Sequence, residues 1–161
     1  MRFSRWLVGA VLALGLAGSV ATAEPVPNRY FLFKINVSNL DRSLDFYTRL
    51  VGLREVRRAG GKNGAALEVV LSQSGQDLEP ELILVYKEGG KPPELGTGLN
   101  MLAFAVPDLK ERVAAMEKAG YAMNAPVREA ARSDLSFATG IAVVFTKDPD
   151  GYPVELLQWN R

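Results

Sequence analysis

Along this chain a short apolar run of strand length is followed by apolar residues at helical spacing, and this order occurs twice. The segments 30–37 and 100–106 are short, mostly apolar runs of the length of a β-strand. Each run leads into a stripe of apolar residues at helical spacing. The stripes consist of Leu40, Leu44, Tyr47 and Val51 in the first copy and Leu109, Val113 and Met116 in the second. The copies are offset by 106 − 37 = 69 residues, because Val37-Ser38-Asn39-Leu40 matches Val106-Pro107-Asp108-Leu109.

The residues that flank each stripe predict where the two helices begin and end. Asn39 and Asp108 precede the stripes and are favoured N-cap residues, and Glu111 follows Asp108 at the spacing of a capping box. Gly52 and Gly120 follow the stripes, where glycine commonly ends a helix. We therefore expect one helix in each copy, with its stripe packed against the core.

Each predicted helix is followed by segments that resemble strands. In the first copy these are 53–58, 65–72 and 81–86, with a glycine-rich turn at 60–64. In the second they are 121–127, 138–146 and 152–159, with the turn Asp148-Pro149-Asp150-Gly151 before the last. The predicted order is therefore β-α-β-β-β twice, an α+β fold.

The first 23 residues predict a signal peptide. Arg2 and Arg5 precede an apolar run at 6–16, and Ala21-Thr22-Ala23 has the small residues of a cleavage site. An uncleaved membrane anchor is the alternative, although the run is shorter than the roughly 20 residues that a span requires. Cleavage would leave 161 − 23 = 138 residues beginning at Glu24, in the periplasm or outside the cell. We expect no membrane contact after cleavage.

Composition excludes several kinds of chemistry. The chain contains no histidine and no cysteine, so thiol catalysis, disulfides and sites built on imidazole or thiolate are excluded. The cleaved chain would carry 17 basic and 18 acidic residues, a net charge of −1, with no basic stripe. Nucleic acid is therefore not an expected partner.

Two motifs resemble a known family. FKINVSNLDRSLDFYTRLVGL at 33–53 and TKDPDGYPVELLQW at 146–159 resemble the glyoxalase/bleomycin-resistance/dioxygenase group, the vicinal oxygen chelate superfamily, and above all its lactoylglutathione lyases. The resemblance implies two βαβββ units whose curved mixed sheets enclose a cavity. It divides the domain 24–161 into a first unit at 29–87, a linker at 88–99 and a second unit at 100–159. It also implies a homodimer.

The resemblance implies four metal-ligand positions, which this chain fills with Leu32, Ile83, Met101 and Glu155. Only Glu155 is a ligand type, whereas zinc sites use three or four nitrogen, sulfur or oxygen ligands. An alignment shifted by two residues would offer Lys34 and Glu81 instead, and lysine is also a poor ligand. We therefore expect no metal site and no cofactor.

Strand alternation predicts which side chains face the implied cavity. Phe31, Phe33, Ile35 and Val37 would face the first helix, and Leu102, Phe104 and Val106 the second. The expected ligand-binding residues are Leu32, Lys34, Asn36, Ile83, Met101, Ala103 and Glu155, joined by Arg132 and Phe137 from the segment 127–140. We hypothesise a Glu155–Lys34 pair that orients a polar group of the ligand. The alternatives are a Glu155 that is hydrogen-bonded at a strand end and a solvated segment 127–140.

Two function classes follow. The first is an exported protein that binds a small, largely apolar molecule, as the bleomycin-resistance branch binds without chemistry. The second is a lyase that isomerises a hemithioacetal, with Glu155 as the catalytic base and, in this alternative alone, a divalent metal. Without such a bound metal to stabilise the enediolate, the activity of the lyase should be very slow. A purely structural dimeric module is a third possibility.

Overall fold

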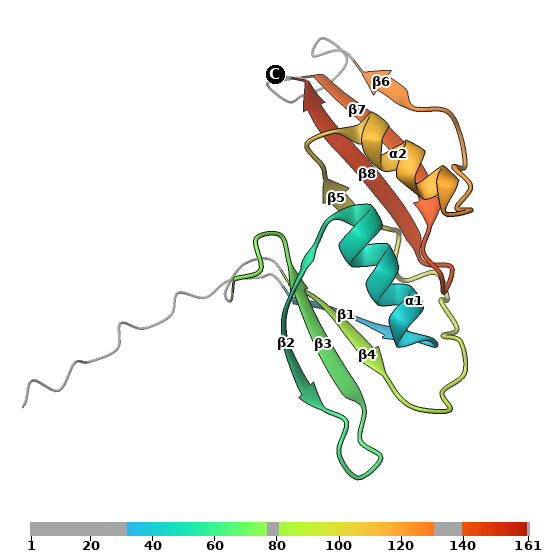
Figure 1. Cartoon of the computed structure of the whole chain (residues 1–161). Coiled ribbons are helices and arrows are strands. Elements are labelled where there is room, and N and C mark those ends of the chain that lie inside the picture. Colours follow the sequence, from blue (N-terminus) through green and yellow to red (C-terminus); the bar gives the residue numbers. More distant parts are fainter. Residues whose placement is uncertain (1–31, 77–80, 131–139, 161) are drawn as a thin grey trace, which may run out of the picture.

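The predicted order of elements occurs twice, as two four-stranded sheets that each carry one helical segment (Figure 1). The structure is a computed structural model that describes residues 32–76, 81–130 and 140–160. The first unit comprises β1 (Leu32–Val37), α1 (Leu40–Leu44), η1 (Asp45–Val51), β2 (Arg54–Gly60), β3 (Leu67–Ser72) and β4 (Glu81–Tyr86). The second comprises β5 (Leu102–Ala105), α2 (Leu109–Lys118), β6 (Arg128–Ala130), β7 (Gly140–Lys147) and β8 (Pro153–Asn160).

The two sheets have the same topology. Their strand orders are β1-β4-β3-β2 and β5-β8-β7-β6. The first strand of each unit pairs in parallel with the last, and the other pairs are antiparallel. Both sheets are therefore mixed, which confirms the α+β fold of two βαβββ units. The first strand of each unit, β1 or β5, lies at an edge of its sheet.

Side-chain caps start both helical segments as predicted. The side chain of Asn39 accepts a hydrogen bond from the Arg42 backbone N–H at 3.0 Å, and Asp108 accepts one from that of Glu111 at 2.9 Å. The first segment is not a single α-helix, because α1 continues into η1, a π-helix. At its end Gly52 adopts a φ of 101°, a left-handed conformation that favours glycine.

The sixth strand was predicted wrongly. The segment 121–127 forms no strand, and β6 comprises Arg128–Ala130 instead. Pro126 has no backbone N–H to give to a sheet, which disfavours a strand through it. Asn124 still donates its backbone N–H to the Phe145 carbonyl at 2.8 Å, and the Tyr121 ring packs against Phe46 at 4.9 Å between ring centroids. The segment therefore covers the core without extending the sheet.

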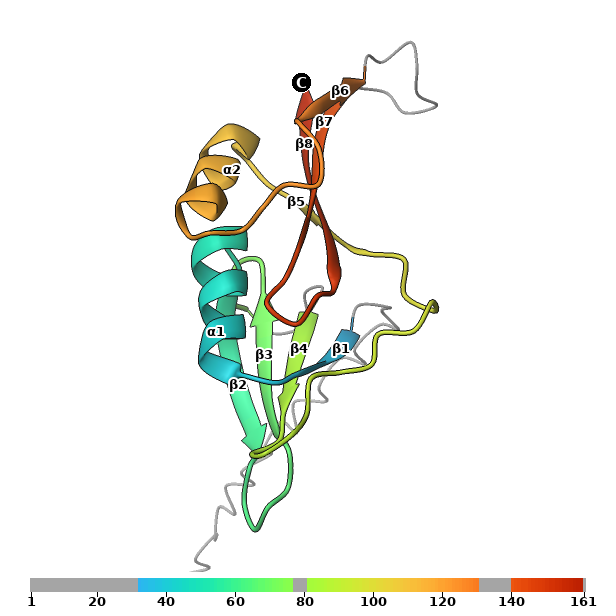
Figure 2. The same cartoon turned by 90° about the vertical axis from the view of Figure 1, so that its right-hand side faces the viewer.

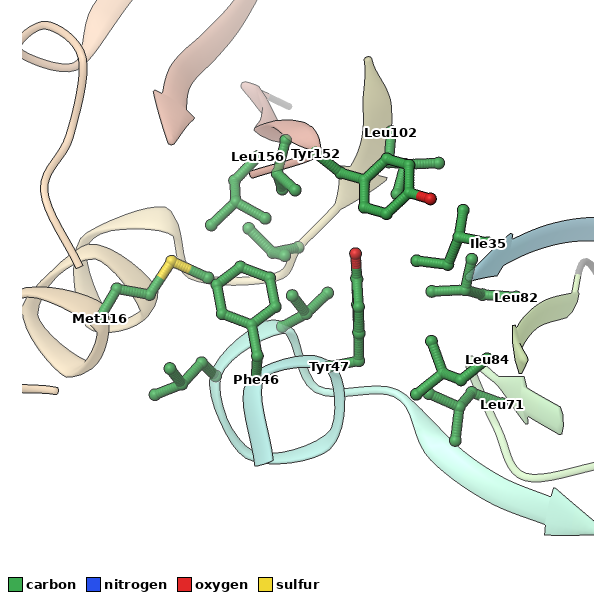
Figure 3. Packing of buried hydrophobic residues seen from close by; sticks show 14 of the residues in the cluster. Ile35, Phe46, Tyr47, Leu71, Leu82, Leu84, Leu102, Met116, Tyr152 and Leu156 are labelled. Carbon is green, nitrogen blue, oxygen red and sulfur yellow. The ribbon is translucent and has the colours of Figure 1, made fainter. Parts of the chain in front are cut away.

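The two units share one hydrophobic core. The helical segments lie on the same side of the molecule, with both sheets on the other (Figure 2). Phe46 of η1 points toward Met116 of α2 and Leu156 of β8, and all three side chains are fully buried (Figure 3). The Tyr47 ring lies 6.0 Å from that of Phe104, again across the two units. This shared core fixes the position of one unit against the other.

The 148–151 turn of the second unit is hydrogen-bonded to the first. The Tyr47 hydroxyl donates to Asp148 Oδ2 at 2.7 Å, while Asp148 Oδ1 accepts the backbone N–H of Tyr152 at 2.8 Å. Asp150 accepts from both the backbone N–H and the hydroxyl of Ser38. Burial raises the pKa of Asp148, and burial together with the nearby Asp148 raises the pKa of Tyr47 well above its usual value.

The predicted signal peptide at 1–23 lies outside the described residues. Within the described ranges, no helix is long and apolar enough to cross a bilayer.

Candidate functional site: a cavity between the two units

A cavity of about 430 Å³ lies at the junction of the two units. Its volume is within the range of small-molecule sites, roughly 300–1,000 Å³. The wall is mostly apolar and comes from four places: β1 and β4, the corner after η1, the end of β3, and β5 with the start of α2. The lining residues are Phe33, Val51, Gly52, Leu53, Gln73, Leu82, Met101, Leu102, Ala103, Phe104, Ala105, Pro107 and Arg112.

The edge position of β5 explains why so much of the wall comes from one strand. No strand lies beyond β5 in its sheet, so consecutive residues from Met101 to Ala105 reach the cavity although their side chains alternate in direction. Phe33 lies on the opposite edge strand, β1, and its side chain is 61% exposed. The cavity therefore opens between the two free sheet edges.

The corner after η1 forms the adjacent wall. Gly52 allows the chain to turn there, and a Cβ at this position would lie 3.2 Å from Nη2 of Arg112. Val51 and Leu53 line the cavity on either side of this glycine. The absence of a side chain at Gly52 thus leaves room for Arg112 beside the cavity.

Arg112 is the charged residue in the cavity wall. It comes from α2, and its Nη1 donates to the Arg49 carbonyl at 3.3 Å. Its Nε is buried and has no hydrogen-bond partner among the described residues. Within the same ranges no carboxylate forms an ion pair with Arg112. Gln73 adds a neutral polar group to the wall.

Two of the predicted ligand-binding residues, Met101 and Ala103, line this cavity. Leu32 and Asn36 are exposed on β1, and Ile83 is buried in β4, but none of these three lines it. Phe33 was predicted to face the helix. It lies on the same face as the buried Ile35, but it is the second residue of β1, where it is exposed and lines the cavity.

The predicted Glu155–Lys34 pair does not form in this chain. Lys34 Nζ instead contacts both carboxylate oxygens of Glu68, at 2.7 and 2.9 Å. Glu155 is half-buried in β8, where it pairs with Ala103 of β5 and Phe145 of β7. Glu68, on β3, the strand next to β4, supplies the carboxylate that Lys34 binds in place of Glu155.

Two further predicted ligand residues, Arg132 and Phe137, lie outside the described residues. Arg128, at the start of the same segment, is exposed in β6.

Comparison with known proteins identifies the family. The model of the Glyoxalase/Bleomycin resistance protein/Dioxygenase superfamily matches residues 29–156, most of the chain. The chain belongs to this superfamily. A probable lactoylglutathione lyase of Vibrio parahaemolyticus is 30% identical over 124 residues, which are 77% of this chain and 86% of that protein.

Solved structures of superfamily members support the fold. The trypanothione-dependent glyoxalase I of Leishmania major is 28% identical, with a TM-score of 0.66 over 82% of this chain and 87% of that one. Glyoxalase I of Zea mays, at 22% identity, has a TM-score of 0.68 over 81% of this chain. This chain spans only 44% of the maize protein.

The four residues that the sequence resemblance implies at metal-ligand positions are divided between the sheets. Leu32 and Ile83 belong to the first sheet, Glu155 belongs to the second, and Met101 directly precedes β5. Among the described residues, no three acidic, histidine or cysteine side chains come close enough together to hold a metal ion.

Arg112 was not among the predicted site residues, although the sequence contains a signal for it. Arg112 lies three residues after Leu109 and four before Met116, so it occupies the apolar stripe of the second helix. A charged residue in the apolar stripe of a helix is a candidate for a functional role, because that side of the helix faces the protein interior. The contribution of Val51, Gly52 and Leu53 had no comparable signal, because it depends on how the two units pack together.

Proposed function

We propose that this chain is an exported glyoxalase-like protein that binds a small, largely apolar molecule in the cavity between its two units. The observation that carries the proposal is the wall of the cavity, in which apolar side chains such as Leu53, Leu82 and Phe104 surround about 430 Å³. Burial of apolar ligand surface in such a site supplies the main binding free energy, and a few polar groups orient the ligand.

Binding without a metal accounts for the residues at the superfamily ligand positions. Leu32 and Ile83 have no donor atoms in their side chains, and the Met101 thioether is a soft ligand that suits neither zinc nor magnesium beside a single carboxylate. Glu155 alone does not make a metal site. We therefore propose a protein that has lost most of its metal ligands and needs no cofactor.

Export and dimer formation are part of the same proposal. The basic, apolar and small residues of 1–23 support cleavage before Glu24 and release into the periplasm or the medium. Leu32 and Phe33, on the free edge of β1, are 62% and 61% exposed. Adjacent exposed side chains of this size favour contact with a second copy, which supports a homodimer.

The alternative is a lyase similar to lactoylglutathione lyase, an activity suggested by the name of the Vibrio relative. In this alternative Glu155 removes the carbon-bound proton of a hemithioacetal. Without a bound divalent metal the enediolate lacks its stabilising electrophile, a loss that costs several kcal/mol of transition-state stabilisation. Assays with the hemithioacetal of glutathione and methylglyoxal, with added nickel or zinc, test this alternative. Turnover that Glu155→Gln abolishes would establish it.

Native mass spectrometry of the protein, purified without chelators from its own compartment, tests the binding proposal. We expect a dimer of chains that begin at Glu24, with no stoichiometric metal and with an organic adduct of low mass. A divalent metal in every subunit would overturn the proposal and favour the lyase.

A further inference from the structure

We infer that the ligand of the cavity is an apolar carboxylic acid, with its carboxylate bound by Arg112 and its apolar part against the β5 wall. This inference rests on the proposed function, because it specifies the chemistry of the molecule that the cavity accepts. It is carried by the state of Arg112 in the wall of an otherwise apolar space.

The guanidinium of Arg112 has unused donors. An arginine side chain carries five N–H groups, and among the described residues Arg112 makes one hydrogen bond, from Nη1 to the Arg49 carbonyl. Its Nε is buried without a partner among the described residues. Buried donors are almost always satisfied in folded proteins, so this guanidinium is short of acceptors. Because Nε itself is enclosed, a molecule in the cavity would have to reach the Nη groups of Arg112.

Other arginines of the described chain have the partner that Arg112 lacks. Arg49 binds Asp45 through two contacts of 2.7 Å, Arg58 binds Glu55 at 2.7 and 2.8 Å, and Arg42 reaches Asp150 at 3.3 Å. No carboxylate within the described ranges forms such a pair with Arg112. The missing acceptor is therefore best supplied as a carboxylate from outside the chain.

The shape and charge of the site favour a carboxylate over a neutral polar group. The planar guanidinium fork matches a carboxylate and forms charge-assisted hydrogen bonds with it. The rest of the wall, including Leu53, Leu82 and Phe104, offers apolar contact to the remainder of the molecule. A molecule with one acidic end and an aliphatic or aromatic body satisfies both parts of the site.

A purely structural role for Arg112 is the competing explanation. Its bond to the Arg49 carbonyl caps the end of η1, and a cationic side chain is favourable there without any ligand. This role predicts that the cavity treats an acid and an alcohol of the same length alike, which separates the two explanations.

The experiment compares octanoate with octanol by calorimetric titration of the cleaved protein. The two probes share an apolar chain and differ in the anionic group. We expect the wild type to bind octanoate at least about tenfold more tightly than octanol, as a charge-assisted hydrogen bond predicts. Arg112→Gln, which retains a donor for the Arg49 carbonyl, should bring the ratio of the two affinities close to one, because octanoate loses more affinity than octanol. Arg112→Lys, which keeps the charge, should restore most of it.

Lys110→Gln is the matched control, because Lys110 is an exposed cation on the same helix that does not line the cavity. It should leave the affinities for both probes unchanged. The measured quantity is the ratio of the two affinities within each variant, so a variant that damages the cavity weakens both probes together.

The outcomes separate the two proposals. Equal affinity for octanoate and octanol in the wild type, or an undiminished preference in Arg112→Gln, would overturn the role of Arg112 and leave an apolar binding cavity in place. Failure of both probes to bind the wild type would instead overturn the proposed binding function. If Arg112→Gln does not fold, the test rests on the wild type and Arg112→Lys. A preference for octanoate in both supports the role of Arg112, and no preference in the wild type overturns it.

Discussion

Removal of the Tyr47 hydroxyl tests how the two units are held together. Tyr47→Phe keeps the buried ring, so it removes the bond to Asp148 Oδ2 with little change in packing. That oxygen has no other hydrogen-bond partner within the described residues. The variant therefore leaves one oxygen of a buried carboxylate unpaired.

The expected cost at pH 7 is about 2 kcal/mol, because hydrogen bonds to charged groups contribute roughly 1.5–3 kcal/mol. This is about a 30-fold shift in the folded-to-unfolded ratio. For a domain of this size it should lower the Tm by about 6 °C.

The cost should shrink in acid. The Tyr47 bond lowers the pKa of Asp148 while burial raises it, and burial is the larger effect. Loss of the hydroxyl therefore raises the folded-state pKa further. A carboxyl group whose pKa is higher in the folded than in the unfolded protein reduces stability at pH values above the unfolded-state pKa. This loss of stability disappears as the pH falls toward the ordinary aspartate pKa of 3.8. Near pH 4 the cost should approach about 1 kcal/mol, that of a neutral hydrogen bond.

Urea unfolding of the wild type and the variant at pH 7 and pH 4 measures both quantities. Tyr121→Phe is the control, because no hydrogen bond of the Tyr121 hydroxyl occurs in the described part of the chain and its ring also packs against Phe46. It should cost less than about 0.5 kcal/mol. A Tyr47→Phe cost below that of the control, or one that grows in acid, would refute this account of the contact.

Further predictions follow from the same physical arguments. The stability of the wild type relative to Asp148→Asn should rise between pH 7 and pH 4, because burial raises the pKa of Asp148; urea unfolding that shows no rise would contradict this. Gly52→Ala should lower the Tm more than Gly64→Ala, since both glycines have positive φ but only Gly52 has a neighbouring side chain within 4 Å; equal melting temperatures would contradict a role for that contact. Asp108→Ala should cost about 1 kcal/mol through loss of the N-cap, as unfolding in urea would report. Amino-terminal sequencing of the exported protein should begin at Glu24, and an intact leader would contradict cleavage.

Local signals in the sequence were sufficient for most of the fold. Asn39 and Asp108 cap the helices as predicted, because capping depends on residues three positions apart. The π-helical turns of η1 were not predictable, since four apolar positions cannot distinguish a wider helical turn from an ordinary one. The strand expected at 121–127 failed because its apolar residues pack on the core while Pro126 interrupts pairing.

The candidate site was less predictable, because it depends on the packing of one unit against the other. Strand alternation placed Ile35 in the core correctly, but it gave Phe33 the same environment. Phe33 lines the cavity near the start of β1, and the cavity is formed by the packing of the two units, which alternation within one strand does not describe. Likewise the sequence alone does not show which acidic residue Lys34 contacts. The pairing of β1, β4 and β3 in the folded sheet brings Lys34 to Glu68.

The location of the bound ligand tests the central claim most directly. Two-dimensional amide NMR spectra of the cleaved protein, recorded during a titration with octanoate, would map that location residue by residue. We predict the largest shifts at Gly52, Ala103 and Arg112, which line the cavity between the units. Shifts confined to Ile83 and Glu155, which the sequence resemblance implies at metal-ligand positions, would contradict the account. A spectrum that octanoate leaves unchanged would also contradict it.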